Sequence, residues 1–234
     1  QTCALPISPI ISVIIPAFNE EKSIGKVVTD IPRDLVANVI VVNNNSTDNT
    51  VQVARDAGAI VMDEPRKGYG WACLKGIEKS KELGTEIVVF LDGDYSDYPE
   101  EIIDVVRPIL DEDYDMVIGS RVLGKREKGS LTPQQVFGNW LATRLMRIFY
   151  RARFSDLGPF RAIKADSLEK LKMSDKTYGW TIEMQIKAAK HKMKFCEVPV
   201  KYRKRIGVSK VSGTVKGTIL AGFKIIGAIF KYRF

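Results

Sequence analysis

The stretch Val88-Val89-Phe90-Leu91-Asp92-Gly93-Asp94-Tyr95-Ser96-Asp97-Tyr98-Pro99-Glu100 decides how the rest of this chain is interpreted. It opens with an apolar run, which is typical of a strand buried on both faces of a parallel sheet. The run ends in two aspartates that flank a glycine, and residues 96–99 predict the start of a helix. Two carboxylates at the carboxyl end of a parallel strand can hold a hard divalent cation, which can in turn hold phosphates. An isolated Asp-Gly-Asp is more often an acidic turn that caps a helix. Only the rest of the sequence can distinguish such a turn from a cation site.

Short apolar runs alternate with helical patterns throughout the first half of the chain. Strands are predicted at 10–15, 39–42, 59–62, 86–91 and 115–118, and helices at 20–31, 50–57, 67–83 and 100–110. This alternation predicts an α/β protein with right-handed crossovers and an open, mainly parallel sheet that helices cover on both faces. Ligands bind such sheets outside the carboxyl ends of the strands. The loops at 16–20, 43–48, 92–94 and 119–121 all follow strand ends, so we expect them to meet at one edge.

The pattern changes beyond residue 121. A polar, basic loop is predicted at 123–132, further helices at 133–153, 180–191 and 214–234, and further strands at 160–163 and 195–202. The sequence contains no linker that would divide the chain. We therefore expect one Rossmann-like catalytic domain at 10–213, a non-native or disordered leader at 1–9 and a C-terminal amphipathic helix at 214–234.

Composition narrows the possible partners and the compartment. The net charge is +8, from 36 basic and 28 acidic residues, which suits a phosphate-bearing partner, nucleic acid or an anionic membrane surface. Three widely spaced cysteines indicate neither a disulfide framework nor a zinc site, and they favour a reducing, cytoplasmic compartment. The chain has no run of 18 or more uncharged apolar residues, so no transmembrane helix is predicted.

Two glycine-related patterns bear on the class of enzyme. Lys67-Gly68-Tyr69-Gly70 resembles a phosphate-binding loop but lacks both the Walker spacing and the dinucleotide fingerprint, so a simple glycine turn before a helix remains an alternative. No glycine-rich turn follows the first strand, which argues against nicotinamide or flavin enzymes and against nucleotidyltransferases. Residues 16–20 instead offer a proline-shaped turn with one carboxylate, which suits a base and a ribose.

Several ordered motifs resemble a known family. Three motifs resemble glycosyltransferase family 2 in their order and spacing. They are Val13-Ile14-Ile15-Pro16-Ala17-Phe18-Asn19-Glu20, Val41-Val42-Asn43-Asn44-Asn45-Ser46-Thr47-Asp48 and Leu91-Asp92-Gly93-Asp94. Three later motifs resemble the dolichol-phosphate mannosyltransferase branch of this family. They are Gly119-Ser120-Arg121, Asp156-Leu157-Gly158-Pro159-Phe160-Arg161 and Arg205-Ile206-Gly207-Val208-Ser209-Lys210. The resemblance covers roughly 10–213. It implies a GT-A fold and an inverting, metal-dependent transfer of a sugar from a UDP- or GDP-sugar, with no nucleic-acid partner.

The resemblance also implies a donor site. Its nucleotide-sugar-binding residues are Pro16, Ala17, Glu20, Asn43, Lys67, Asp92, Gly93, Asp94, Arg205 and Lys210. Asp92 is expected beside the ribose and the metal, and Asp94 as a ligand of Mg²⁺ or Mn²⁺. Relatives usually carry an aspartate at Asn43, and an amide carbonyl accepts a hydrogen bond from the base without charge assistance.

Four residues are the candidates for catalysis: Asp94, Arg121, Asp156 and Glu183. Arg121, with Arg205 and Lys210, can stabilise the leaving nucleoside diphosphate, or these residues belong to a solvated basic face. Glu183 stands where many relatives carry a catalytic base. It can instead orient other groups, because a phosphate acceptor needs no base, or simply favour the start of a helix. Asp156 is expected on the acceptor side.

Two late helices bear on the acceptor. At ~100° per residue, the lysines of 214–234 form a narrow stripe beside an apolar surface, and 133–153 groups its arginines similarly. Such helices lie in a membrane interface or pack on the sheet. The pattern favours a polyprenyl phosphate acceptor at the inner face of a membrane. A soluble acceptor, such as a small phosphorylated acid or a glycan, remains the alternative, followed by nucleotidyl transfer or non-catalytic binding of a nucleotide sugar.

Overall fold

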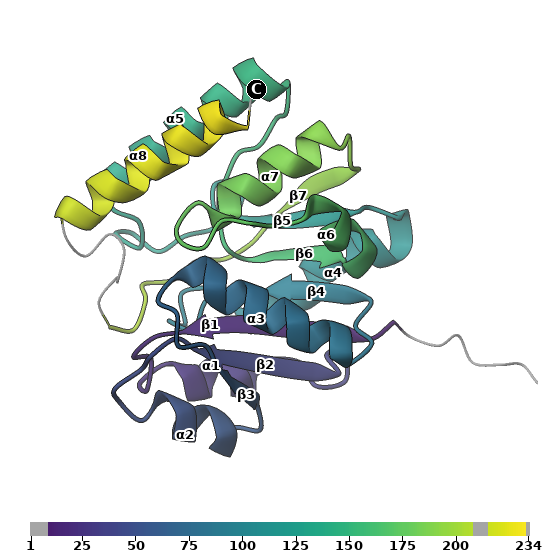
Figure 1. Ribbon diagram of the computed structural model, residues 1–234, viewed down its shortest axis with the longest axis vertical. Coiled ribbons are helices and arrows are strands. Elements are labelled where there is room, and N and C mark those ends of the chain that lie inside the picture. Colours follow the sequence, from purple (N-terminus) through teal and green to yellow (C-terminus); the bar gives the residue numbers. More distant parts are fainter. Residues whose placement is uncertain (1–8, 208–214, 233–234) are drawn as a thin grey trace, which may run out of the picture.

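A mixed sheet with helices on both faces forms the centre of the protein (Figure 1). The computed structural model describes residues 9–207 and 215–232, with no side chains described at 215–221 and 223. Within this part of the chain, seven strands follow the order β3-β2-β1-β4-β6-β5-β7. They are β1 (Ile11–Ala17), β2 (Asn38–Asn43), β3 (Ile60–Asp63), β4 (Ile87–Phe90), β5 (Met116–Ser120), β6 (Arg161–Lys164) and β7 (Phe195–Pro199). All neighbouring strands pair in parallel except β6, which is antiparallel to β4 and β5.

The helices alternate with the strands, as the sequence predicts. They are α1 (Ile24–Asp30), α2 (Thr50–Asp56), α3 (Tyr69–Glu82), α4 (Ile102–Glu112) after a 3₁₀ turn η1 (Pro99–Glu101), α5 (Pro133–Tyr150), α6 (Ala165–Leu171), α7 (Trp180–Lys190) and α8 (Val215–Lys231). In Figure 1, α3 and α7 lie in front of the sheet and α1 and α4 behind it. At the upper left, α5 and α8 lie side by side, joined by the hydrogen bond from Tyr150 to the carbonyl of Ile229.

Helices cover both faces of the sheet, so the strands carry apolar side chains on both faces. Val13 and Ile15 of β1 point into the core that α1 and α4 cover, whereas Ile14 between them points into the core that α3 and α7 cover. Successive side chains of a strand point to opposite faces, so a sheet covered twice needs continuous apolar runs. The predicted α/β class with a mainly parallel central sheet is confirmed.

Three details differ from the sequence-based expectation. The antiparallel β6 breaks the expected series of parallel crossovers, since apolar content does not encode the direction of a strand. Helix α6 was not predicted, and α5 ends at Tyr150, because Arg151 adopts a left-handed conformation with φ 55°. The leader at 1–8, the domain boundary at 213 and Lys210 lie outside the described residues. Among the residues that are described, none of the helices is long and apolar enough to span a membrane.

Helix α3 lies unusually close to the sheet at Gly76. A Cβ atom added to Gly76 would stand 2.3 Å from Cγ2 of Ile14, which is itself fully buried in β1. Real Cβ atoms do not approach other atoms so closely. The glycine therefore sets the distance between α3 and β1, and with it the position of the first turn of α3 at the edge of the sheet.

We predict that Gly76→Ala destabilises the protein by about 1–3 kcal/mol, because the new methyl group overpacks the contact with Ile14. For a chain of this size each kcal/mol lowers the melting temperature by roughly 2–4 °C. Gly227→Ala is the matched control, since it also lies inside a helix but its Cβ would meet nothing within 4 Å. The control should gain about 0.5–1 kcal/mol. Thermal unfolding of both variants tests the contact, and equal melting temperatures would contradict it.

Candidate active site

A cavity of about 280 Å³ lies at the carboxyl edge of the sheet. Eight of the ten residues predicted to bind the nucleotide sugar line it: Pro16, Ala17, Glu20, Lys67, Asp92, Gly93, Asp94 and Arg205. They come from the end of β1, from the loops after β1, β3 and β4, and from a segment more than a hundred residues later. The structure therefore brings these predicted residues together around one space. Their role in binding stays a prediction.

Asp94 is the most firmly held residue of the cavity wall. Its side chain is nearly buried, and Oδ1 accepts hydrogen bonds from the backbone N–H and the hydroxyl of Ser96, at 3.0 and 2.5 Å. Oδ2 lies 2.8 Å from Nη1 of Arg205. A carboxylate oxygen carries more than one lone pair, so Asp94 can still accept from a ligand in the cavity.

Asp92 stands beside Asp94 and has a different environment. Its Oδ1 accepts one hydrogen bond from the hydroxyl of Tyr69, at 3.1 Å. Burial, and then the neighbouring charge of Asp94, raise the pKa of Asp92 to about 6, although Arg205 and the bond from Tyr69 act in the opposite direction. A carboxylate whose pKa is raised by a neighbouring carboxylate is a place where a cation binds favourably.

Asn44, and not the predicted Asn43, lines the cavity among the described residues. The amide of Asn43 is engaged within the edge of the sheet: its nitrogen donates to Asp63 at 2.8 Å and its oxygen accepts from the N–H of Ser46 at 3.0 Å. Asn44 donates to the carbonyls of Glu64 and Arg66 and accepts from the N–H of Gly68, each at 2.8 Å. Asn44 thus fixes the glycine loop. Contact between Asn43 and the base stays a prediction.

The glycine loop serves both readings that the sequence left open. Gly68 precedes α3 with φ +146°, so it is the turn before a helix, and Lys67 and Gly68 also face the cavity. A Cβ at Gly68 would meet the carbonyl oxygen of Lys176 at 2.2 Å. The loop therefore needs a glycine because a second backbone segment crosses it.

A second cavity of about 310 Å³ adjoins the first. The two cavities share four lining residues: Tyr69, Asp92, Tyr178 and Arg205. Gly138 of α5, Gly222 and Ile225 of α8, and the guanidinium-bearing Arg121 also line the second cavity. A group bound in one cavity therefore lies next to a group bound in the other.

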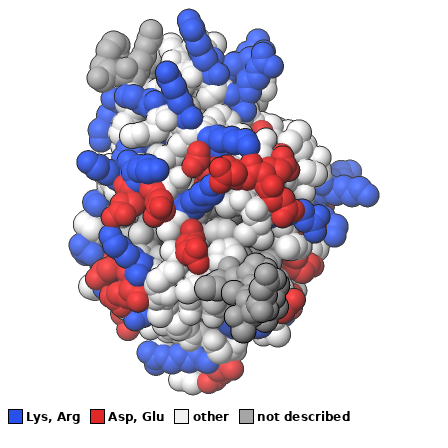
Figure 2. Space-filling model, turned by 90° about the vertical axis from the view of Figure 1, so that its right-hand side faces the viewer, with Lys and Arg blue, Asp and Glu red and all other residues white. Residues whose placement is uncertain are grey.

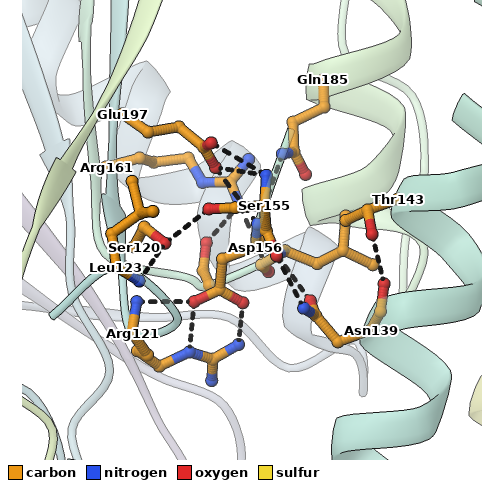
Figure 3. Close-up of polar contacts among 12 residues, drawn as sticks. Ser120, Arg121, Leu123, Asn139, Thr143, Ser155, Asp156, Arg161, Gln185 and Glu197 are labelled. Carbon is orange, nitrogen blue, oxygen red and sulfur yellow. Dashed lines mark hydrogen bonds and ion pairs between the residues drawn. The ribbon is translucent and has the colours of Figure 1, made fainter. Parts of the chain in front are cut away.

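Arg121 is held in place by Asp156 (Figure 3). Oδ2 of Asp156 accepts from the N–H and Nε of Arg121, both at 2.8 Å, and Oδ1 accepts from Nη2 at 2.7 Å. Burial alone would raise the pKa of Asp156, but the charge and hydrogen bonds of Arg121 outweigh burial and lower it. Asp156 is fully buried and is not among the described residues that line either cavity. Its geometry is that of an anchor for Arg121, whereas a direct role on the acceptor stays a prediction.

The loop that carries Asp156 is itself fixed by buried polar contacts (Figure 3). Glu197 of β7 accepts from the backbone N–H of Ser155, at 2.8 Å, and from that of Asp156, at 3.1 Å. Gln185 of α7 donates to the carbonyl of Asp156 at 2.9 Å. Through these contacts the loop is attached to the sheet at β7 and to the buried helix α7, and Asp156 in turn holds Arg121.

Glu183 does not have the surroundings of a catalytic base. It is fully buried, and it is not among the described residues that line the two cavities. Burial would raise its pKa, but Lys187, Ser174, Tyr232 and the N–H of Asp175 outweigh burial and lower the pKa to about 2. A carboxylate of such low pKa is a poor proton acceptor at neutral pH. The structure supports the alternative role, in which Glu183 orients other groups.

Of the four residues that the two cavities share, sequence reasoning missed Tyr69 and Tyr178. Tyr69 lies within the glycine motif and follows a predicted strand end, so its position was available as a signal. Tyr178 lies in the loop between α6 and α7, and nothing in its sequence surroundings indicates a site. Asp97 was also missed: it is buried, and neither of its carboxylate oxygens has a hydrogen-bond partner among the described residues. Burial, and then Asp92 and Asp94, raise the pKa of Asp97 well above its usual range.

Comparison with known proteins decides the family. The model of the family described as "Glycosyl transferase family 2" matches residues 12–172. The chain belongs to glycosyltransferase family 2. An uncharacterised glycosyltransferase of Mycobacterium tuberculosis is 34% identical over 214 residues, which cover 90% of this chain and 94% of that protein. The UDP-N-acetylglucosamine–dolichyl-phosphate N-acetylglucosaminyltransferase of Methanococcus voltae is 30% identical over 240 residues, covering 92% and 93% of the two chains.

Solved structures support the GT-A fold of this family 2 glycosyltransferase. Glucosyl-3-phosphoglycerate synthase from Mycobacterium tuberculosis, in complex with Mn²⁺, UDP and glucosyl-3-phosphoglycerate, superimposes with a TM-score of 0.76. The alignment covers 96% of this chain and 80% of the synthase, at 22% sequence identity. The dolichyl-phosphate hexose transferase of Haloferax volcanii is 30% identical over 216 residues, which cover 90% of each chain. The glycosyltransferase activity that the sequence motifs imply is thereby confirmed.

We predict that Glu183→Gln flattens the dependence of stability on pH in the acidic range. The pKa of Glu183 falls from its usual 4.5 to about 2 on folding, so its contribution is fully present above about 4.5 and is lost as the pH falls toward 2. At neutral pH the variant should lose about 3–5 kcal/mol, because Lys187 would remain as an unpaired, largely buried charge. Urea unfolding at a series of pH values measures both effects. Glu100→Gln, at an exposed position, is the control and should leave the wild-type profile unchanged.

Proposed function

We propose that this glycosyltransferase transfers a sugar, with inversion, from a nucleoside diphosphate sugar to a polyprenyl phosphate, with the help of Mg²⁺ or Mn²⁺. The observation that carries the proposal is the pair of adjoining cavities that share Asp92, Arg205 and two tyrosines. Direct transfer requires the donor and the acceptor to be bound at the same time with the sugar between them. The acceptor oxygen then bonds to the anomeric carbon while the bond from that carbon to the diphosphate breaks.

The first cavity suits the donor. Asp92, Asp94, Lys67 and Arg205 line one wall, where carboxylates can hold a cation and the basic groups can hold phosphates. Among the described residues no three acidic, histidine or cysteine side chains form a metal site. Two carboxylates are nevertheless a fitting set, because Mg²⁺ is often bound by one or two carboxylates together with substrate phosphates and water. Such an ion offsets the charge that develops on the leaving diphosphate.

The second cavity suits a phosphate acceptor. Arg121 presents its guanidinium there, and Asp156 holds that group in a fixed orientation. Guanidinium groups bind phosphate through paired, charge-assisted hydrogen bonds. A phosphate is already ionised at neutral pH, so the reaction needs no general base. This agrees with the surroundings of Glu183, whose carboxylate is occupied by four hydrogen-bond donors and by the ammonium group of Lys187.

Helices α5 and α8 suit a lipid that carries the acceptor phosphate. They wall the second cavity, and α5 exposes large apolar side chains beyond it: Phe137 is 62% exposed and Trp140 56%. Arg144 and Arg147 are exposed on the same helix. Figure 2 shows Lys and Arg side chains crowding the upper end of the molecule, where Figure 1 places the ends of α5 and α8. Apolar and basic side chains on one helix favour binding to an anionic membrane surface. Two relatives named for dolichyl phosphate support this acceptor class.

We predict that UDP or GDP binds in the presence of Mn²⁺ and that Asp94→Asn weakens this binding tenfold to hundredfold. The loss corresponds to one charge-assisted interaction of about 1.5–3 kcal/mol, while the amide can keep the contact with Ser96. Calorimetric titration with and without Mn²⁺ measures the affinities. Asp104→Asn, on the exposed face of α4, is the control. Equal affinity of the wild type and Asp94→Asn would contradict the donor site.

We predict that the protein co-sediments with anionic phospholipid vesicles and that Trp140→Glu weakens this binding about tenfold. The variant loses roughly 1.5–3 kcal/mol of apolar burial in the lipid interface. Leu110→Glu is the matched control, because it places the same charge at an exposed apolar position of α4. Absence of wild-type binding, or equal losses in both variants, would argue against a lipid acceptor. Transfer to a soluble phosphorylated acid without lipid would support the alternative acceptor.

A further inference from the structure

One loop reaches the junction of the two cavities. Residues 172–179 connect α6 to α7, and Tyr178 of this loop lines both cavities. Under the proposed function the junction is where the sugar lies during transfer, since the sugar leaves a donor in the first cavity for an acceptor in the second. The position of Tyr178 therefore bears directly on the reaction, and three sets of contacts determine it.

The first set is backbone packing against the glycine loop. A Cβ at Gly70 would lie 2.1 Å from the carbonyl oxygen of Asp175, so the two backbones touch without an intervening side chain. The N–H of Trp71 donates to the carbonyl of Lys176 at 3.3 Å, and Nζ of Lys176 lies 4.2 Å from the centre of the indole ring. The loop at 172–179 thus packs directly on the first turn of α3.

The second set comes from Glu183, in the first turn of α7. Its carboxylate accepts from the backbone N–H of Ser174 at 3.0 Å, from the Ser174 hydroxyl at 2.6 Å and from the N–H of Asp175 at 2.7 Å. Asp175 in turn accepts from the N–H groups of Thr177 and Gly179, on either side of Tyr178. A continuous series of hydrogen bonds therefore runs from Glu183 to the residues that flank Tyr178.

The third set comes from α8. The hydroxyl of Tyr232 donates to Oε1 of Glu183 at 2.7 Å, and it lies 3.3 Å from the hydroxyl of Ser174. Lys224 donates to the hydroxyl of Thr177, and its Nζ lies 3.7 Å from a carboxylate oxygen of Asp175. Lys224 belongs to the lysine stripe of 214–234, for which the sequence left a membrane interface and packing on the sheet as alternatives. In the structure Lys224 contacts this loop.

We propose that Glu183 is a positioning residue that fixes Tyr178 between donor and acceptor, and that α8 acts on transfer through the same loop by way of Tyr232 and Lys224. Helix α8 also walls the second cavity through Gly222 and Ile225. The position of α8 therefore determines both the shape of the second cavity and the position of Tyr178 at the junction of the two cavities. What Tyr178 does to the sugar rests on the proposed function, whereas the link from α8 to the loop does not.

The link is tested without substrate by amide hydrogen exchange. Tyr232→Phe and Ser174→Ala each remove one O–H donor to Glu183 and leave the rest of the side chain nearly unchanged. Each variant should speed the exchange of the 173–179 amides about fivefold, as the loss of one hydrogen bond does, with no change in the strands of the core. Tyr114→Phe, at the start of β5, is the matched control and should leave the loop unchanged. Unchanged exchange of the loop in Tyr232→Phe, or equal acceleration in the core, would overturn the proposal.

Kinetic measurements distinguish a role in positioning Tyr178 from an effect on the stability of the protein. Tyr178→Ala and Tyr232→Phe should both lower kcat, by tenfold or more for the first and severalfold for the second. Tyr232→Phe should keep the Mn²⁺-dependent affinity for UDP within twofold, since Tyr232 is not among the described residues that line either cavity. A fall in UDP affinity that parallels the fall in kcat would contradict the positioning role. If no donor is accepted at all, the proposed function fails, while the exchange measurement still decides on the link between α8 and the loop.

Discussion

The ion pair between Arg205 and Asp94 joins the loop after β4 to the segment after β7 at the carboxyl edge of the sheet. The chain around Arg205 runs beside the segment that follows Asp94: the N–H of Ile206 donates to the Asp94 carbonyl and the N–H of Arg203 to the Ser96 carbonyl, both at 2.9 Å. Asp94 is nearly buried, so its charge needs a partner, and removal of one member of a buried pair is costly. The need to pair one carboxylate thus brings a cation from a distant part of the chain into the first cavity and places it where the second cavity begins.

The donor side was predictable because it is built from local rules. Strands buried on both faces leave continuous apolar runs, and parallel strands gather their carboxyl ends at one edge. Residues that directly follow such runs, as Asp92 and Pro16 do, have to meet there whatever the details of packing. At the loop after β2 it is Asn44, the neighbour of the predicted Asn43, that lines the cavity, and a shift of one position is beyond what a sequence pattern resolves.

The acceptor side was less predictable because contacts distant in sequence create it. Strand β6 enters between β4 and β5 in the antiparallel direction, and its apolar residues are compatible with either direction. Tyr178 gains its position from Gly70, from Glu183 and from a helix near the end of the chain. A single sequence records none of these partners. The motif that holds Glu183 indicated an important residue, but it did not indicate whether that residue acts on the substrate or on the protein.

The carboxylates of this protein divide according to how many donors surround them. Glu183 and Asp156 are fully buried, and each is surrounded by donors, so each is held ionised and serves as an anchor. Asp92 accepts from Tyr69 and faces the cavity next to Asp94, and its pKa rises to about 6. A carboxylate with a full set of donors gains little from a further cation, whereas a crowded pair that faces an open cavity gains much. The number of donors thus separates Glu183, whose carboxylate is fully occupied, from Asp92, which accepts one hydrogen bond from Tyr69 and faces the cavity.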